Sequence, residues 1–295
     1  MVLIDALQQT LIFIPLILGI YLTYQVLATT DLTPDGTFVL GAAIFARLIT
    51  SGVSQTVSTI AALLGGLLAG FAVCALQRIA KINSLIASIL AVFMLYSINF
   101  AILNQPNISL LNTSTLLGNL QNGNAQLFLL IILLFAIVLF FGIFLLIRSP
   151  FGLTFRAFGV NKKLLSKLGK HPTFYLALGL GLSNMMAALC GVMTAQMNGY
   201  ADINMGVGTA LTGIGAVVIG CKLMRTLFLN SGSFSLMIDL MGCLLGGYLY
   251  FLMLNVFLLI GLNPIYLKLC LGLLLAVFLS TANYSQKNKL ALQDD

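Results

Sequence analysis

The sequence has no tryptophan, no glutamate and very little charge. Its 295 residues include 14 Lys and Arg and seven acids, all of them Asp, so only 7% of the chain is charged. Soluble domains are about 25% charged, and a chain with so few charges would aggregate in water. The composition therefore excludes a soluble enzyme, a disordered protein and a nucleic-acid-binding protein. The net charge of +7 fits a membrane protein, because such proteins collect Lys and Arg in their cytoplasmic loops.

Patterns typical of metal binding and catalysis are also missing. The five cysteines lie in or beside apolar segments without metal-type spacing, so we interpret them as packing residues. His171 is the single histidine, and no Cys or acid lies near it in the sequence to complete a metal site. The sequence has no Ser-His-Asp arrangement, no paired carboxylates and no Walker A motif. We therefore expect no metal, no cofactor and no enzymatic activity in this chain itself.

Long apolar runs dominate the sequence, which is 60% hydrophobic with a mean hydropathy of +1.08. A membrane-spanning helix needs about 20 mostly apolar residues. Two Gly- and Ala-rich pieces, 37–50 and 208–221, are shorter than this. The sequence predicts an all-α polytopic membrane protein with about eight to ten transmembrane or re-entrant helices, in a single domain of residues 1–295. The runs long enough to cross are 10–28, 56–76, 84–103, 127–147, 173–195, 233–256 and 265–282.

The basic residues predict which loops face the cytoplasm. Residues 148–171 are rich in Lys and Arg and contain no acid, which indicates a cytoplasmic loop. Arg78 and Lys81 mark a second one. The uncharged stretch 104–126, which is rich in Asn and Gln, is expected on the outside, and so is Asp202.

The short piece 37–50 leaves the side of the N-terminus open. A full crossing would place the N-terminus outside. A re-entrant half-helix would place it inside, with Asp31 on the outside. We favour the re-entrant or broken-helix arrangement, because irregular backbone at membrane depth is tolerated where it lines a cavity.

Two segments that include these short pieces share a pattern. The first contains Asp31 and Asp35 and continues as Gly-Thr37-x-x-x-Gly, and the second contains Asp202 and later reads Gly-Thr209-x-x-x-Gly. Many transporters carry a pair of interrupted helices at corresponding positions of two repeats, beside the pathway. We therefore interpret these five polar residues as candidate positions along a substrate path.

The shared pattern also predicts two pseudo-repeats, at about 1–147 and 173–295, joined by the cytoplasmic loop 148–172. A simpler interpretation treats the aspartates as helix caps and the glycines as sites of close helix packing. The two interpretations are compatible, because a capped half-helix can still line a pathway.

Four amides complete the candidate path. Polar side chains at membrane depth are costly and mark functional sites. Asn184 lies in the middle of a predicted span, Asn99 lies late in its span, and Gln196 and Asn198 lie near an outer end. Hydrogen bonding between helices is the alternative role for any one of them.

The basic loop contains a predicted amphipathic helix over residues 162–168. Asn161 is a plausible N-cap, and Leu164, Leu165 and Leu168 form one apolar face. Such a helix could lie on anionic lipid or dock in a groove of a cytoplasmic partner. Charge and periodicity alone do not separate these alternatives.

The chain resembles the permease subunits of bacterial ABC importers of the branched-chain amino acid and ribose type, and among them the tryptophan/tyrosine-type permeases. The first segment that carries the resemblance reads DLTPDGTFVLGAA at 31–43. The last is LSNMMAALCGVMTAQMNGYADINMGVGTALTGIGAVVIG at 182–220. Residues 81–99, 105–112 and 151–161 add to the resemblance.

The resemblance implies a multi-pass permease of the bacterial inner membrane that carries an amino acid or similar small organic solute. Its implied partners are a second copy of the permease in a homodimer, two cytoplasmic ATPase subunits, an extracytoplasmic substrate-binding protein and the lipid bilayer. It also implies that the loop 151–171 holds the helix that couples to the ATPase. The implied coupling residues are Arg156, Phe158, Gly159, Asn161, Leu164, Leu165, Lys167 and Leu168.

An ion-coupled secondary transporter is the alternative function, and a membrane scaffold without a pathway is a third. Secondary transporters usually place an ionisable group in the middle of a span, and none is well centred here. Asp239 is expected near an interface or paired with Arg225 or Lys222.

Overall fold

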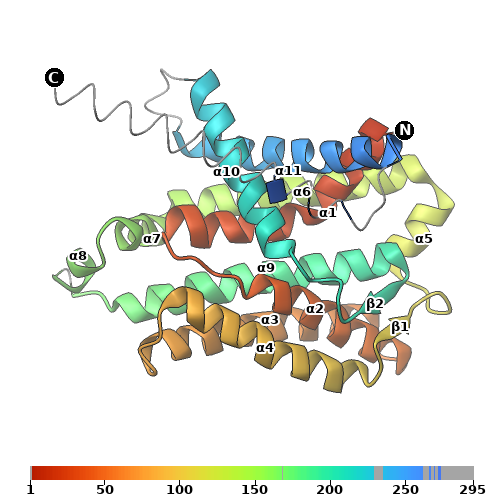
Figure 1. The fold of residues 1–295 in the computed structure, drawn as a ribbon, viewed down its shortest axis with the longest axis horizontal. Helices are drawn as coiled ribbons and strands as arrows, with labels where there is room; N and C mark the ends of the chain where they lie inside the picture. The colour runs from red at the N-terminus through yellow and green to blue at the C-terminus, as the bar shows by residue number, and fades with distance from the viewer. Residues whose placement is uncertain are drawn as a thin grey trace.

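The computed structural model describes residues 2–167, 169–228 and 235–261, together with residues 266, 269, 272 and 273. Its helices form a bundle whose long members run between two ends (Figure 1). The first part contains α1 (Val2–Ile20), the π-helix η1 (Tyr21–Val26), α2 (Pro34–Thr50), α3 (Gln55–Arg78), α4 (Ser84–Leu103), β1 (Asn107–Ser109), α5 (Leu116–Gly123) and α6 (Ala125–Arg148). The second part contains α7 (Pro150–Val160), α8 (Lys162–Lys167), α9 (Pro172–Asn198), β2 (Tyr200–Asp202), α10 (Thr209–Leu227) and α11 (Ser235–Leu259).

Seven helices among the described residues are long and apolar enough to cross a membrane. They confirm the predicted all-α polytopic fold, and α4 agrees with the predicted span at both of its ends. Two expectations are wrong in detail. The first span begins at Val2 instead of residue 10, and α10 reaches 19 residues, so the piece 208–221 belongs to a full-length span. The predicted span 265–282 lies outside the described residues, apart from residues 266, 269, 272 and 273.

The termini of several helices follow from local chemistry. The side chain of Asn83 accepts a hydrogen bond from Leu85 N at the start of α4, and the side chain of Asn124 accepts from Gln126 N and Leu127 N at the start of α6. Asx side chains at such positions satisfy N–H groups that the helix leaves free. At its outer end α9 stops at Gly199, whose φ of 73° is easily reached only by glycine.

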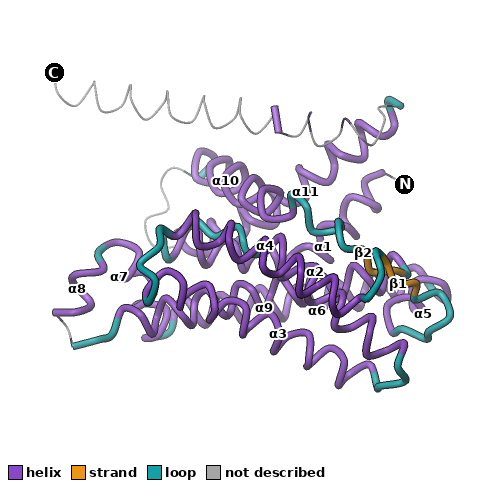
Figure 2. The backbone as a smooth tube through the Cα atoms, turned by 60° about the horizontal axis from the view of Figure 1, so that its bottom comes forward, coloured by secondary structure: helices purple, strands orange, loops and turns teal. Residues whose placement is uncertain are grey.

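One end of the bundle carries the basic loop, and the other carries the uncharged segment 104–126. Helices α7 and α8 lie together at one end, and β1, β2 and α5 lie at the other (Figures 1 and 2). The positive-inside rule places the α7–α8 end in the cytoplasm. At the outer end β1 pairs antiparallel with β2, with Ile108 opposite Ala201, so one strand from each part of the chain meets there.

Residues 27–50 cross the bundle as irregular backbone followed by the helix α2, and we call this segment the broken crossing. Helices α1 and η1 run from the outer end to the cytoplasmic end, where Val26 lies against α7. Residues 27–33 then return as irregular backbone, and α2 continues to the outer end. The expected break is present, but the expected re-entrant topology is wrong, because this segment completes a crossing and Val2 lies at the outer end.

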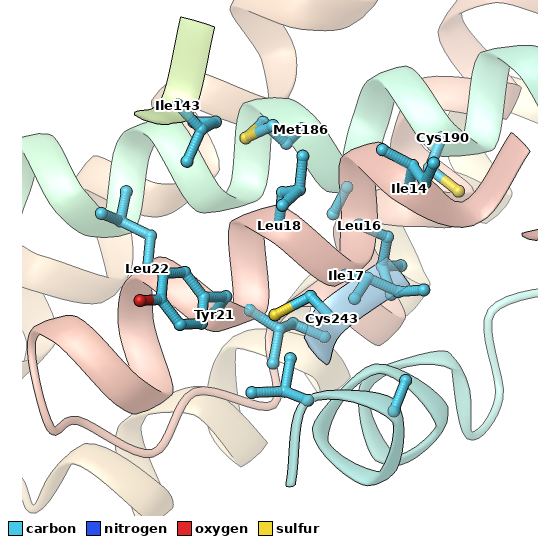
Figure 3. Close-up of a cluster of buried hydrophobic side chains, with 14 of the residues drawn as sticks. Ile14, Leu16, Ile17, Leu18, Tyr21, Leu22, Ile143, Met186, Cys190 and Cys243 are labelled. Atoms are coloured by element: carbon cyan, nitrogen blue, oxygen red, sulfur yellow. The ribbon is translucent and has the colours of Figure 1, made fainter. Parts of the chain in front are cut away.

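The core forms around α1 and α9. Figure 3 shows Leu16 and Leu18 of α1, and Tyr21 at the start of η1, packed between α9, α6 and α11. Small residues let the backbones of α2 and α9 approach closely. A Cβ added at Gly41 would lie 2.2 Å from the carbonyl oxygen of Ala188, and one added at Gly191 would lie 1.9 Å from the carbonyl oxygen of Phe38. Such contacts are typical of membrane helix interfaces.

Candidate functional site

A polar network lies where the broken crossing meets α9. The carboxylate of Asp31 accepts hydrogen bonds from the backbone N–H and the hydroxyl of Thr33, and from Asn184 Nδ2 at 3.0 Å. Asn184 Oδ1 in turn accepts from the hydroxyl of Thr37 at 2.9 Å. Asn184 lies near the middle of α9, so the network lies at mid-membrane depth. Its four residues are buried.

Asn99 of α4 joins the first turn of α2 from another helix. Its Nδ2 donates to the carbonyl oxygen of Gly36 at 3.0 Å. Its Oδ1 is buried and has no hydrogen-bond partner among the described residues. A buried acceptor without a donor is costly, so this oxygen is a candidate contact for a passing polar group.

Asp35 links the starts of α2 and α10. Its carboxylate accepts from Ala210 N at 2.6 Å, from the hydroxyl of Thr209 at 3.0 Å and from Gly208 N at 3.2 Å. A helix start carries free N–H groups and a partial positive charge. Asp35, which lies in the first turn of α2, therefore supplies the anion that caps α10. We call this contact the Asp35 cap.

The structure places Asp35, just before the first Gly-Thr pair, against the second pair, Gly208 and Thr209, but it leaves Asp31 and Asp202 apart. Asp31 was expected outside and instead lies buried at mid-depth. Asp202 lies at the outer end, where its Oδ1 accepts from Asn204 N at 2.7 Å in a local turn. Two residues separate Asp31 from α2, whereas six residues separate Asp202 from α10. The aspartates thus do not occupy corresponding positions.

The outer amide Gln196 holds α5 in place. Its Oε1 accepts from Gln55 Nε2 at 2.9 Å and from Leu117 N at 3.3 Å. Gln55 Oε1 also accepts from Leu116 N, so two glutamines satisfy the start of α5. Asn198 is exposed at the end of α9. Gln55 and Thr33 carry no signal in the sequence, because nothing in the local pattern distinguishes them from other polar residues near helix ends.

The basic loop folds as two helices instead of the one that was predicted. α7 precedes Asn161, and α8 covers Lys162–Lys167. Leu165 is fully buried, so it packs against the permease itself, contrary to its expected place on an open docking face. The side chain of Leu164 and the whole of Leu168 lie outside the described part of the chain.

Other coupling candidates divide into buried and exposed residues. Phe158 is fully buried, and Gly159 packs so closely that an added Cβ would lie 2.1 Å from the carbonyl oxygen of Val26. Arg156, Asn161 and Lys167 are exposed. Gly159 therefore packs α7 against the end of η1, and the three exposed residues lie on the surface at this end of the bundle.

Asp239 is paired, as the sequence analysis expected. Arg225 donates to its two carboxylate oxygens at 2.6 and 2.7 Å. A bidentate pair of this kind neutralises the carboxylate near the end of α10. No group of three or more His, Cys, Asp or Glu residues that could hold a metal occurs among the described residues.

The chain matches the family described as "Branched-chain amino acid transport system / permease component" over residues 2–280. An uncharacterized protein of Rickettsia prowazekii (strain Madrid E) is 48% identical over 281 residues, which cover 95% of this chain and 97% of that protein. The tyrosine transport system permease protein of Clostridioides difficile (strain R20291) is 32% identical over 281 residues, which cover 95% of this chain and 91% of that protein.

A shorter match is the autoinducer 2 import system permease protein LsrC of Shigella flexneri, 29% identical over 61% of this chain and 52% of that protein. No solved structure matches. The family match does not favour the alternative of an ion-coupled secondary transporter. The chain belongs to the family of branched-chain amino acid transport system permease components, the membrane subunits of ABC importers, and is a multi-pass protein of the bacterial cytoplasmic membrane.

Proposed function

We propose that this permease imports an amino acid of the tyrosine class. The observation that carries the proposal is the relative named as a tyrosine transport permease, which matches 95% of this chain. The relatives named for autoinducer 2 match only 61%. The permease works as a homodimer with ATPase subunits at the α7–α8 end and a substrate-binding protein at the β1–β2 end.

The path follows the broken crossing. Interrupted helices at mid-depth offer polar groups to a solute where a continuous helix offers none. Asp31, Thr37, Asn99 and Asn184 lie at this break, and the Asp35 cap adds Thr209. Gln196, Asn198 and Asp202 belong to the outer entrance.

Coupling runs from α7 to the break. Gly159 packs against the carbonyl oxygen of Val26, the last residue of η1, and Asp31 follows five residues later. A shift of α7 that is driven by the ATPase therefore moves the backbone that leads into the polar network.

ATP-dependent uptake tests the proposed function. The permease, its ATPase and its binding protein, reconstituted in liposomes, are expected to accumulate radiolabelled tyrosine only when ATP is supplied. A catalytically inactive ATPase is the control. Tyrosine uptake that follows a sodium or proton gradient without ATP would contradict the proposal and favour an ion-coupled transporter.

Val160→Asp is expected to weaken ATPase binding at the exposed α7–α8 surface. Val160 is 89% exposed beside Asn161, and an apolar side chain so placed is a candidate contact for a partner. A new charge there disfavours burial in an interface, and the expected loss is about tenfold or more in affinity. Co-purification with the ATPase measures this loss.

Leu111→Asp is the matched control. Leu111 is 82% exposed at the opposite, outer end of the bundle, so the same kind of substitution leaves ATPase binding unchanged. Equal co-purification of both variants with the ATPase would show that the α7–α8 surface is not the dock.

A further inference from the structure

Asp31, Asp35 and Asp239 differ in how their charge is balanced. Asp239 is paired with Arg225. Asp35 receives three donors at the start of α10, where the helix dipole is positive. Asp31 receives only neutral donors, from Thr33 and Asn184, and no basic side chain pairs with it among the described residues. Its side chain is only 3% exposed.

A buried carboxylate without a cation is energetically costly. The structure nevertheless holds Asp31 in a fixed orientation, because Asn184 is itself fixed by hydrogen bonds to Thr37 and to the carbonyl oxygen of Leu180. A carboxylate has about four acceptor positions, and the donors from Thr33 and Asn184 use three of them. The Asp31 carboxylate can therefore accept one further hydrogen bond. A positively charged donor is favoured, because it would also balance the buried negative charge.

A second acceptor lies beside the first turn of α2, which Asp31 precedes by two residues. Asn99 is 1% exposed, and its Oδ1 has no hydrogen-bond partner among the described residues. Asn99 Nδ2 donates a hydrogen bond to Gly36 O. This bond fixes the orientation of the amide and leaves its Oδ1 without a donor in the described part of the chain. The first turn of α2 is therefore flanked by two acceptors that lack a full set of donors.

We propose that Asp31 is the binding group for a primary ammonium group of the solute as it passes the break, with Asn99 Oδ1 as a second acceptor. An ammonium group supplies one positive charge and three N–H donors, which match the acidic charge of Asp31 and the open acceptor positions. The substrate class is then an amine or amino acid. This inference rests on the proposed transport function and adds the chemical group that the permease recognises.

The test compares three ligands that share a phenol ring. Tyrosine and tyramine carry the ammonium group, and 3-(4-hydroxyphenyl)propionate lacks it. Binding is measured by isothermal titration to the permease–ATPase complex in lipid nanodiscs, without the binding protein. Wild type is expected to bind tyramine more tightly than the deaminated acid by about tenfold or more, the value of a hydrogen bond to a charged group.

Asp31→Asn keeps the shape of the side chain and removes its charge, so the preference for tyramine is expected to vanish. Asp31→Glu keeps the charge and should retain the preference for tyramine. If the asparagine variant does not assemble, loss of the preference in Asp31→Glu would contradict the inference. Asp5→Asn is the matched control, because Asp5 is an exposed acid in the first turn of α1. This variant should bind like wild type.

Two results would overturn the inference: an undiminished preference for tyramine in Asp31→Asn, or no preference in wild type. Failure of the proposed function is seen separately, as a wild-type complex that does not accumulate tyrosine with ATP and its binding protein. A complex that transports tyrosine but whose Asp31→Asn variant keeps the preference would retain the function and lose only the ammonium site.

Discussion

Gly191→Ala is expected to separate α2 from α9 and to lower the thermal unfolding temperature of the purified protein. The new Cβ would lie 1.9 Å from the carbonyl oxygen of Phe38. Because that oxygen belongs to the backbone of α2, no side-chain movement relieves the overlap and the whole helix must shift. Overpacking of this kind costs about 1–3 kcal/mol, occasionally more. Tyrosine uptake should also fall, since Thr37 and Asn184 face each other across this interface.

Gly142→Ala is the matched control for this substitution. Gly142 is also a helical glycine in a membrane span, but it lies on the exposed face of α6, and an added Cβ meets nothing within 4 Å. Alanine is favoured over glycine in a helix by about 1 kcal/mol, so this variant should be at least as stable as wild type. An equal loss of stability in both variants would show that the α2–α9 contact is not as close as described.

Asp35→Ala is expected to release the start of α10. The substitution removes the acceptor for Ala210 N, Gly208 N and the Thr209 hydroxyl. Loss of a helix cap costs about 0.5–2 kcal/mol, and hydrogen bonds to a charged group are worth about 1.5–3 kcal/mol each. We therefore expect a loss of at least about 2 kcal/mol, measured by thermal unfolding, with faster hydrogen exchange confined to the first turn of α10.

Asp202→Ala is the control for Asp35→Ala, because it removes the same type of side chain from a position that does not cap α10. Asp202 accepts a hydrogen bond from Asn204 N in a turn at the outer end, and a surface substitution of this kind changes stability by about 0.5 kcal/mol or less. Asp35→Asn keeps one acceptor oxygen and should lie between wild type and Asp35→Ala. If Asp202→Ala and Asp35→Ala lowered stability equally, the Asp35 cap would not be the main anchor of α10.

Composition and apolar run length were sufficient to predict most of the fold. The approximate span 84–103 agrees with α4, whose caps Asn83 and Asn104 end the apolar run on both sides. The start of α1 was missed because Asp5, Gln8 and Gln9 interrupt the run, although the helix continues through them.

The contacts at the candidate site could not be predicted from sequence patterns. The Asp31–Asn184 and Asp35–Thr209 pairs are 153 and 174 residues apart in the chain, and helical periodicity relates only near neighbours. The repeated Gly-Thr pattern marked these segments as candidates, but it gave no reason to expect that they touch. In the basic loop the pattern predicted an amphipathic helix, and it could not show that Leu165 faces the bundle.

The short outer sheet has a consequence for the order of assembly. β1 and β2 have three residues each, and strands this short are not stable alone. β1 follows α4, whereas β2 follows α9, so the pair cannot form until both helices have been inserted in the membrane. Loop closure over such a separation is slow. The outer end therefore closes late during biosynthesis, and until then the polar segment 104–126 remains open to water on the far side of the membrane.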